Sequence, residues 1–210
     1  MMKQKAYNLF KEKLFASKLK PGQFVTQSEL TKLLDVPVGA LREALQKLEA
    51  EELVRVIPQR GIQIAEINVK LVKEAFQLRM FLEKEAVRYF TQNAPDEVIE
   101  KLESEAGGII ERAKNEISEQ LKNDAQRFDF AFHETIVDAV GNSLLSNVYR
   151  VNYDKIKVIW LETVYPPERI IPAMEEHLEV IRAMKGREPE TAAAAMEKHL
   201  IISKNRALGI

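Results

Sequence analysis

The residues of this sequence with the clearest chemistry are its three histidines, His133, His177 and His199. Asp129 precedes His133 by four residues, so on a helix their side chains project from one face about one turn apart. A carboxylate and an imidazole placed in this way can hold one cation together. Such a pair also arises often by chance, and the alternative is that each histidine is a surface residue or a hydrogen-bonded core residue.

The composition excludes several other kinds of chemistry. The chain has no cysteine among its 210 residues, which excludes a thiolate metal site, a cysteine nucleophile and a disulfide framework and fits a reducing cytosol. No apolar run approaches the roughly 20 residues that span a bilayer, and the lysine-rich N-terminal stretch lacks the apolar core of a signal peptide. We therefore expect a cytoplasmic protein with no membrane partner.

Helices must position the histidines and Asp129. From residue 68 onward no segment is typical of a strand, and the spacing of apolar residues predicts about six helices with wide apolar faces. Glycine or proline marks most of the breaks between them. This pattern favours an all-helical bundle. The predicted helices cover about residues 68–91, 95–121, 124–140, 143–164, 168–185 and 189–207.

The first third of the chain has a different pattern. Apolar residues on one face predict a helix over residues 3–17, and Pro21-Gly22 then turns the chain. Thr26 and Glu29 form a capping box that opens a short second helix. The residues predicted to face inward in these two helices are Ala6, Phe10, Leu14, Leu30, Leu33 and Leu34.

A third helix and a hairpin follow. The apolar residues of the third helix, from Leu41 to Leu48, recur at helical spacing and leave a polar outer face that includes Arg42. Val54–Ile57 and Ile62–Ile64 are typical of two strands joined by a tight turn. Two short helices followed by a hairpin with an arginine at its tip are the layout of a winged helix-turn-helix.

Four segments of this region are Lys20-Pro21-Gly22, L-R-E-A-L-Q-K-L-E-A-E over residues 41–51, Leu53-Val54 and Pro58-Gln59-Arg60-Gly61. At this spacing, residues 5–67 resemble the DNA-binding domain of the GntR family of bacterial regulators. The resemblance implies that Arg42 contacts a base or a phosphate from the recognition helix, and that Arg60 and Gly61 form the wing tip. Gln46 and Lys47 share the outer face of the recognition helix and are expected to meet DNA as well.

The chain departs from the family pattern at two positions. Val38 stands where most members have the arginine of a Ser-Arg-Thr-Pro segment, and Ser28 replaces the arginine that is usual in the preceding helix. A bidentate arginine–guanine contact contributes about 1–3 kcal/mol of discrimination, so the operator sequence cannot be carried over from relatives. The net charge of residues 1–70 is still +4, against −5 for the remainder, which suits a domain that meets a polyanion.

The helical part contains the segments Asp129-Phe130-Ala131-Phe132-His133, Gly141-Asn142, Glu176-His177-Leu178 and His199-Leu200. They resemble the FCD effector domain of the FadR-type branch of the family. The resemblance implies that one divalent metal ion is bound inside the bundle by Asp129, His133, His177 and His199. This donor set suits Zn²⁺, Ni²⁺, Mn²⁺ or Fe²⁺ and leaves coordination positions for water or an anion.

The same resemblance implies two contacts with an effector. Arg79 matches an arginine that faces the effector pocket, and its guanidinium fork suits a carboxylate. The alternative for Arg79 is an ion pair with Glu83 on the helix surface. Asn142 is expected either to bind the effector or to cap the helix that begins beside it.

The sequence therefore predicts a mainly α protein of two domains. Residues 1–67 form a winged helix-turn-helix with a small β-hairpin wing, and residues 68–210 form an all-helical FCD-type domain. We expect a ligand-responsive transcriptional regulator, a repressor, that binds an inverted-repeat operator in double-stranded DNA as a homodimer and responds to a small organic acid. No enzymatic activity is expected. The alternatives are a metal-dependent enzyme and a helical interaction protein whose winged helix does not bind DNA.

Overall fold

The structure is a computed structural model that describes residues 2–162 and 166–210, without the side chain of residue 162. Contacts within the chain divide it into two compact units, Met1–Val72 with Tyr153–Val164 and Lys73–Asn152 with Tyr165–Ile210. The domain boundary expected at residue 67 stays a prediction, because this grouping assigns part of the later sequence to the first unit.

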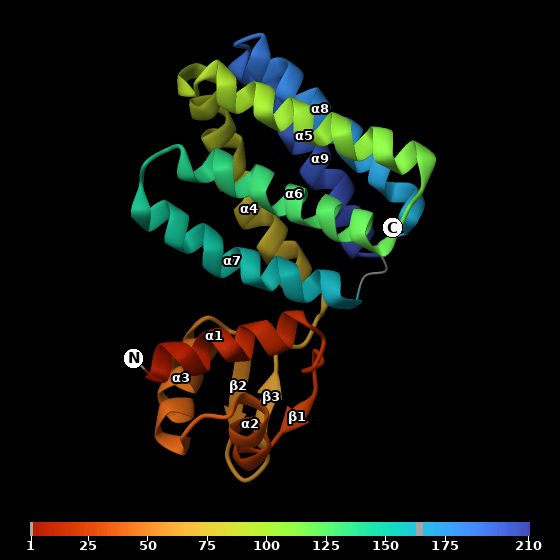
Figure 1. Ribbon diagram of the computed structural model, residues 1–210. Coiled ribbons are helices and arrows are strands. Elements are labelled where there is room, and N and C mark those ends of the chain that lie inside the picture. The colour runs from red at the N-terminus through yellow and green to blue at the C-terminus, as the bar shows by residue number, and fades with distance from the viewer. Residues whose placement is uncertain (1, 163–165) are drawn as a thin grey trace. The chain divides into compact units, whose positions relative to one another are not determined.

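The first unit combines three complete helices and parts of two others with a small sheet (Figure 1). Its complete helices are α1 (Met2–Phe15), α2 (Gln27–Leu34) and α3 (Val38–Ala50), and its strands are β1 (Phe24–Val25), β2 (Val54–Ile57) and β3 (Gly61–Ile64). The strands are antiparallel in the order β1-β3-β2. The strand β1 is not among the expected elements because two residues show no periodicity.

The capping box at the start of α2 is confirmed. The side chain of Thr26 accepts a hydrogen bond from the backbone of Glu29 at 3.1 Å, and the Glu29 carboxylate accepts one from the backbone of Thr26 at 2.6 Å. The residues expected to face inward are buried, with the exception of Leu33, whose exposed fraction is 39%. Leu30 and Leu34 lie one turn apart on the buried face, which leaves Leu33 at its flank.

The helix α7 (Ser143–Glu162) contributes to both units. From Tyr153 onward it groups with the winged helix, where Val158 belongs to the same apolar core as α1 and α3. Asp154 forms an ion pair with Lys11 of α1. Burial raises the pKa of the Asp154 carboxyl, because desolvation outweighs the attraction of Lys11.

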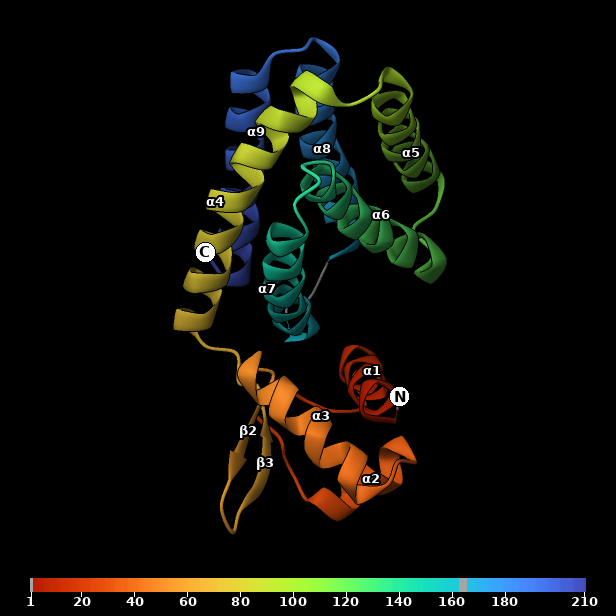
Figure 2. The ribbon, with the colours of Figure 1, turned by 90° about the vertical axis from the view of Figure 1, so that its left-hand side faces the viewer.

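The second unit is entirely helical in the part of it that the structure describes (Figure 2). α4 lies beside α9, with Lys84 Nζ 2.5 Å from Glu197 Oε2 and Arg88 Nε 2.9 Å from Glu190 Oε1. α5 lies beside α8 in the same way. The helices are α4 (Val69–Asn93), α5 (Asp96–Asn115), α6 (Glu119–Asp138), the first half of α7, a short 3-10 helix η1 (Pro167–Arg169), α8 (Ile170–Lys185) and α9 (Pro189–Ala207).

One helix break differs from the expectation. The second helix of this part was expected to reach residue 121, whereas α5 ends at Asn115 and α6 already begins at Glu119. The intervening Glu116 is extended, and the side chain of Ser118 caps α6 by accepting from the backbone of Leu121 at 3.2 Å. Because no glycine or proline marks this break, only the capping preference of serine could have indicated it.

The mainly helical fold with a winged helix-turn-helix at its N-terminal end is confirmed. The expected helix over residues 143–164 is present as α7, and its last two residues lie outside the described part. Among the described helices, none combines the length and the apolar character that a membrane span requires.

Candidate metal centre and DNA-binding face

The four ligands expected from the sequence meet inside the second unit. Asp129 and His133 lie one turn apart on α6, while His177 comes from α8 and His199 from α9. One ligand atom from each lies within 4.8 Å of the others. The three imidazoles are buried, and the Asp129 side chain is 28% exposed. Three helices therefore place three imidazoles and one carboxylate around a single point.

Three of the distances within the cluster suit one ion. Nε2 of His133 and Nε2 of His199 are 3.2 Å apart, and Asp129 Oδ1 is 3.2 Å from His177 Nε2 and 3.9 Å from His133 Nε2. Two atoms that each bind the same ion at roughly 2.1 Å lie no more than about 4.2 Å apart. These three separations stay within that limit.

Carboxylates lie on the far side of two of the imidazoles. Nδ1 of His199 is 2.8 Å from Glu176 Oε2 on α8. Nδ1 of His133 is 2.6 Å from Glu83 Oε2 on α4, an ion-pair distance, although the ring is poorly aligned for a hydrogen bond. A carboxylate at Nδ1 favours the tautomer with its proton on that nitrogen. The lone pair of each ring is then on Nε2, toward the cluster.

Each of these two carboxylates, those of Glu83 and Glu176, also forms an ion pair with an arginine. Arg79 Nε lies 2.6 Å from Glu83 Oε1, and both side chains are almost fully buried. Arg169, at the end of η1, forms an ion pair with Glu176. Burial alone would raise the pKa of Glu83, but Arg79 and His133 outweigh it and lower that pKa to about 2. Both glutamates are therefore ionised and able to accept from a histidine.

Two of the imidazoles, those of His177 and His199, are kept neutral by their surroundings. Desolvation lowers the pKa of His177, and desolvation together with the nearby His177 lowers the pKa of His199 to about 4. The pKa of Asp129 is lowered by His177 and His133, which outweigh the effect of its burial. Neutral imidazoles and an ionised carboxylate are the forms that bind a metal.

This arrangement fits a cation better than it fits a metal-free core. With a carboxylate beside the Nδ1 atom of each ring, the Nε2 lone pairs of His133 and His199 face one another at 3.2 Å. His177 Nε2, beside the Asp129 carboxylate, also has no hydrogen bond among the described residues. Lone pairs that converge in a buried place repel one another unless a positive charge lies between them.

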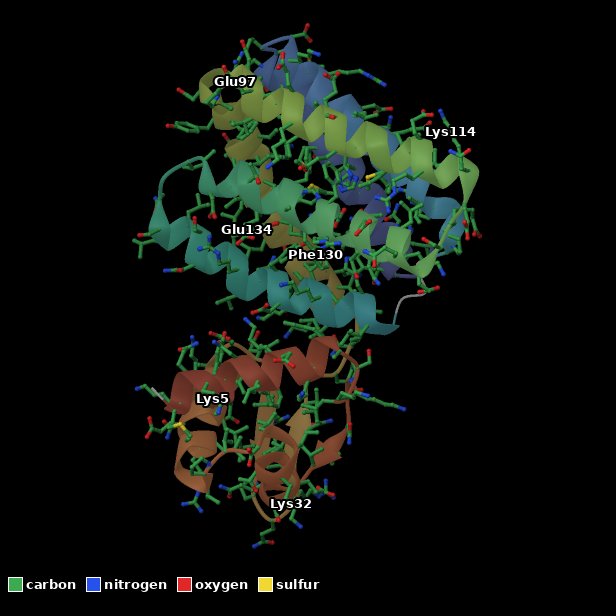
Figure 3. The ribbon with its side chains drawn as sticks, in the orientation of Figure 1. Lys5, Lys32, Glu97, Lys114, Phe130 and Glu134 are labelled. Carbon is green, nitrogen blue, oxygen red and sulfur yellow. The ribbon has the colours of Figure 1, made fainter. Side chains whose placement is uncertain are left out.

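The DNA-binding face expected in the first unit lies on the outer side of α3. Arg42 and Gln46 are exposed there, one turn apart, while Leu41 and Leu48 are fully buried on the opposite side. Figure 3 shows the side chains of this unit, and Lys32 of α2 is a further exposed cation. The face can therefore meet a polyanion without disturbing the core.

Lys47 lies differently from Arg42. Its ammonium group is 3.9 Å from the centre of the Tyr7 ring, as in a cation–π contact, and 3.8 Å from Glu51 Oε1. Tyr7 in turn donates to Glu51 Oε2 at 2.7 Å. Lys47 is thus held toward α1 and the end of α3, and a phosphate must compete with these partners.

The hairpin between β2 and β3 forms the wing. Arg60 donates its backbone N–H to Ile57 at 3.0 Å, and Gln59 has a φ of 65°. With Pro58 before it, this is the geometry of a type II turn, and it leaves the Arg60 side chain exposed at the tip.

The backbone conformation of the wing itself requires glycine at position 61. Its φ is 103°, and a Cβ atom there would lie 2.7 Å from the carbonyl oxygen of Val25. Only glycine lets β1 approach β3 this closely. The wing therefore needs glycine at this position whether or not it touches DNA, and a contact between Gly61 and DNA stays a prediction.

The comparisons with known proteins cover both units. Residues 2–64 match the model of the bacterial regulatory proteins of the gntR family, and residues 74–201 match that of the FCD domain. The chain belongs to the GntR family and has an FCD domain. Family members of this kind are transcriptional regulators rather than enzymes, and they bind DNA and usually dimerise.

Individual relatives of this GntR protein are also named as transcriptional regulators. It is 26% identical to the HTH-type transcriptional repressor GlaR of Escherichia coli (strain K12), over 93% of this chain and 90% of GlaR. It is also 26% identical to the HTH-type transcriptional regulator YdhC of Bacillus subtilis (strain 168), over 92% of this chain and 85% of YdhC. Among solved structures, E. coli McbR/YncC has the same fold, with a TM-score of 0.81 at 16% identity over 100% of this chain and 98% of that one.

The two expected effector residues of this GntR protein have clear partners. Arg79 forms the ion pair with Glu83 that was the alternative to an effector contact, but the pair is buried rather than on the helix surface. Asn142 is exposed, and its side chain accepts from the backbones of Leu144 and Leu145 at 3.0 and 3.2 Å, which caps α7. The capping alternative is therefore realised, and the effector role of both residues stays a prediction.

Sequence reasoning missed the roles of Glu83 and Glu176. Glu83 was considered only as a partner of Arg79, and Glu176 only as the neighbour of His177. Glu83 comes from α4, and Glu176 contacts the histidine of another helix, so no spacing along the chain could have revealed either contact. The general preference of metal-bound imidazoles for a carboxylate at the second nitrogen was the one available indication.

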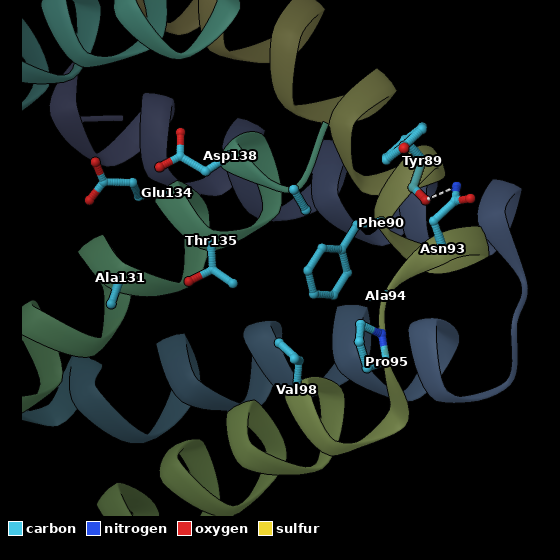
Figure 4. Close-up of a pocket in the computed structure, with 11 residues that line it drawn as sticks. Tyr89, Phe90, Asn93, Ala94, Pro95, Val98, Ala131, Glu134, Thr135 and Asp138 are labelled. Carbon is cyan, nitrogen blue, oxygen red and sulfur yellow. Dashed lines mark hydrogen bonds between the residues drawn. The ribbon is translucent and has the colours of Figure 1, made fainter. Parts of the chain in front are cut away.

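A separate hollow of about 600 Å³ lies between α4, α5 and α6 (Figure 4). Phe90, Pro95 and Val98 form an apolar side, and the carboxylates of Glu134 and Asp138 lie across from them. Arg150 is paired with both carboxylates, at 2.8 Å and 2.5 Å. None of the expected effector or metal residues lines this hollow, and its acids are already neutralised.

Proposed function

We propose that this protein is a ligand-responsive transcriptional repressor whose FCD domain binds one divalent metal ion through Asp129, His133, His177 and His199. One observation carries the proposal: the Nε2 atoms of His133 and His199 face each other at 3.2 Å while their Nδ1 atoms face Glu83 and Glu176. When bound, the ion supplies a Lewis acid with coordination positions open to an anion. Zn²⁺, Ni²⁺, Mn²⁺ and Fe²⁺ all suit these ligands.

The charges around the cluster support an anionic effector. Three ionised carboxylates, those of Asp129, Glu83 and Glu176, stand against two arginines, Arg79 and Arg169. These groups alone leave one net negative charge, and a divalent ion reverses it to one net positive charge. A small carboxylate then enters a buried site whose charge favours it. Arg79, and Asn142 after a rearrangement of its cap, are the proposed protein contacts of that effector.

The proposed mechanism is a shift between conformations of a homodimer. Arg42, Gln46, Lys47 and Arg60 contact the operator, an inverted repeat whose half-sites match the two winged helices. An effector that binds one arrangement of the dimer more tightly shifts the population toward it and changes the fit to DNA. DNA must change the affinity for the effector by the same factor.

Native mass spectrometry and DNA binding test this proposal together. The protein is purified with divalent metal supplied and is measured by native mass spectrometry, then titrated into the DNA upstream of its own gene with and without a panel of small carboxylic acids. We expect a dimer with one metal ion per chain, specific DNA binding, and a change in that binding with at least one acid. A monomer without metal that binds all DNA equally would contradict each part.

A further inference from the structure

The recognition helix α3 exposes one large apolar side chain. Val38 is its first residue and is 47% exposed, whereas Leu41, Leu45 and Leu48 are buried. Arg42 lies four residues further along and is exposed as well, so the two side chains share the outer face. This face therefore begins with an apolar group and continues with a cation.

The start of α3 is also unusually bare. The preceding Pro37 provides no side-chain cap. Gly39 follows, and a Cβ atom there would meet nothing within 4 Å. A helix end with so little side-chain bulk can approach a surface closely. The N-terminal residues of a recognition helix are those that reach base edges in the major groove.

The chemistry of valine selects one partner in that groove. An isopropyl group cannot accept or donate a hydrogen bond, so it gains nothing from a phosphate or from the polar edge of guanine. The apolar group that the major groove offers is the 5-methyl group of thymine. Valine is stiff at χ1 in a helix, so ordering its side chain against a methyl group costs little entropy.

We infer that Val38 reads a thymine in each half-site through its 5-methyl group. The inference rests on the proposed DNA binding by α3 and adds the identity of one base to it. Val38 then determines specificity at the position where an arginine would favour guanine. The operator has an A·T pair there, in both halves of the inverted repeat.

Uracil provides the test, because it differs from thymine only by the missing methyl group. A duplex is first selected from a randomised DNA library with the wild-type protein, and each of its thymines is then replaced by uracil, one symmetry-related pair at a time. Dissociation constants are measured by fluorescence anisotropy for the wild type, Val38→Ala, Val38→Arg and Val148→Ala. Val148, on α7, is the control, being an exposed valine (49%) of the second unit.

At one pair of positions we expect uracil to weaken wild-type binding by about fourfold per half-site, the value of one buried methyl group. Val38→Ala should bind the thymine duplex more weakly and lose most of the distinction between thymine and uracil, and Val38→Arg should shift the preference toward guanine. Val148→Ala should behave as the wild type does. Specific binding with no position sensitive to uracil, or discrimination retained in Val38→Ala, overturns the inference. Failure to select any duplex contradicts the proposed DNA binding itself.

Discussion

The proposed metal centre and the proposed DNA-binding face of this protein are built in opposite ways. At the proposed metal centre, side chains from α6, α8 and α9 converge in a buried place, and carboxylates from α4 and α8 lie beside two of the imidazoles. On α3 the functional side chains come from a single helix and are exposed. Folding alone brings the residues of the first site together. The second site is completed only by the DNA that it is proposed to bind. Substitutions should therefore affect folding and metal affinity at the first, and mainly sequence discrimination at the second.

Acidification is expected to have the largest effect, because it lowers both the stability of the folded chain and its affinity for the metal. His177 and His199 have lowered pKa values when folded, that of His199 at about 4, against about 6.5 in an unfolded chain. Between these values the unfolded chain binds more protons, so the free energy of unfolding falls as the pH falls from about 6.5 toward 4. Protonation also releases the metal. Thermal melts across this range, with and without chelator, should show both losses; a stability that is flat from pH 7 to pH 4 would contradict the assignment.

Removing the carboxylates behind the imidazoles should have the next largest effect. Glu83→Gln and Glu176→Gln keep the four ligands but weaken the orientation of His133 and His199, and we expect metal affinity to fall by about 10–100-fold. Calorimetric titration of the metal measures this. Glu179→Gln is the matched control, since Glu179 lies on α8 and pairs with the exposed Lys198 at 2.8 Å. Equal affinities in all three variants would leave the glutamates without this role.

Arg42→Ala tests the DNA face. If Arg42 reads a base, the variant should lose on the order of 1–3 kcal/mol of operator binding and relax specificity at one position of each half-site. Metal content and the melting temperature should not change, because the side chain is exposed and lies in the first unit. The measurement is anisotropy on the selected operator and on single-base variants of it. Unchanged binding would remove α3 as the recognition helix.

Lys47→Ala should have the smallest effect. Lys47 was expected to meet DNA, yet its ammonium group lies over Tyr7 and near Glu51. A contact with a phosphate would have to replace these two contacts, which reduces its net contribution to binding. We expect a loss of less than about threefold that is equal for all sequences, with a slightly flatter dependence on salt. A sequence-dependent loss would show that Lys47 reads bases instead.

The two regions differ in which of their contacts could be predicted from the sequence. The clustering of Asp129 with the three histidines could be predicted because histidine is rare in this chain and a family resemblance linked distant positions. Glu83 and Glu176 could not, since the contacts that define them cross between helices. In the first unit, the capping box at Thr26 and the burial of Leu30 and Leu34 follow from local patterns. The contact of Lys47 with Tyr7 depends on how α1 packs against α3, which no local pattern contains.

The metal content of purified protein tests the central claim most directly. Wild type, His177→Ala and the control Glu134→Gln, which changes an acid of α6 outside the cluster, are each purified with divalent metal supplied and measured by elemental analysis. We predict one ion per chain in the wild type and in Glu134→Gln, and almost none in His177→Ala, whose winged helix should stay folded by circular dichroism. Wild type without metal, or His177→Ala with a full equivalent, would contradict the account.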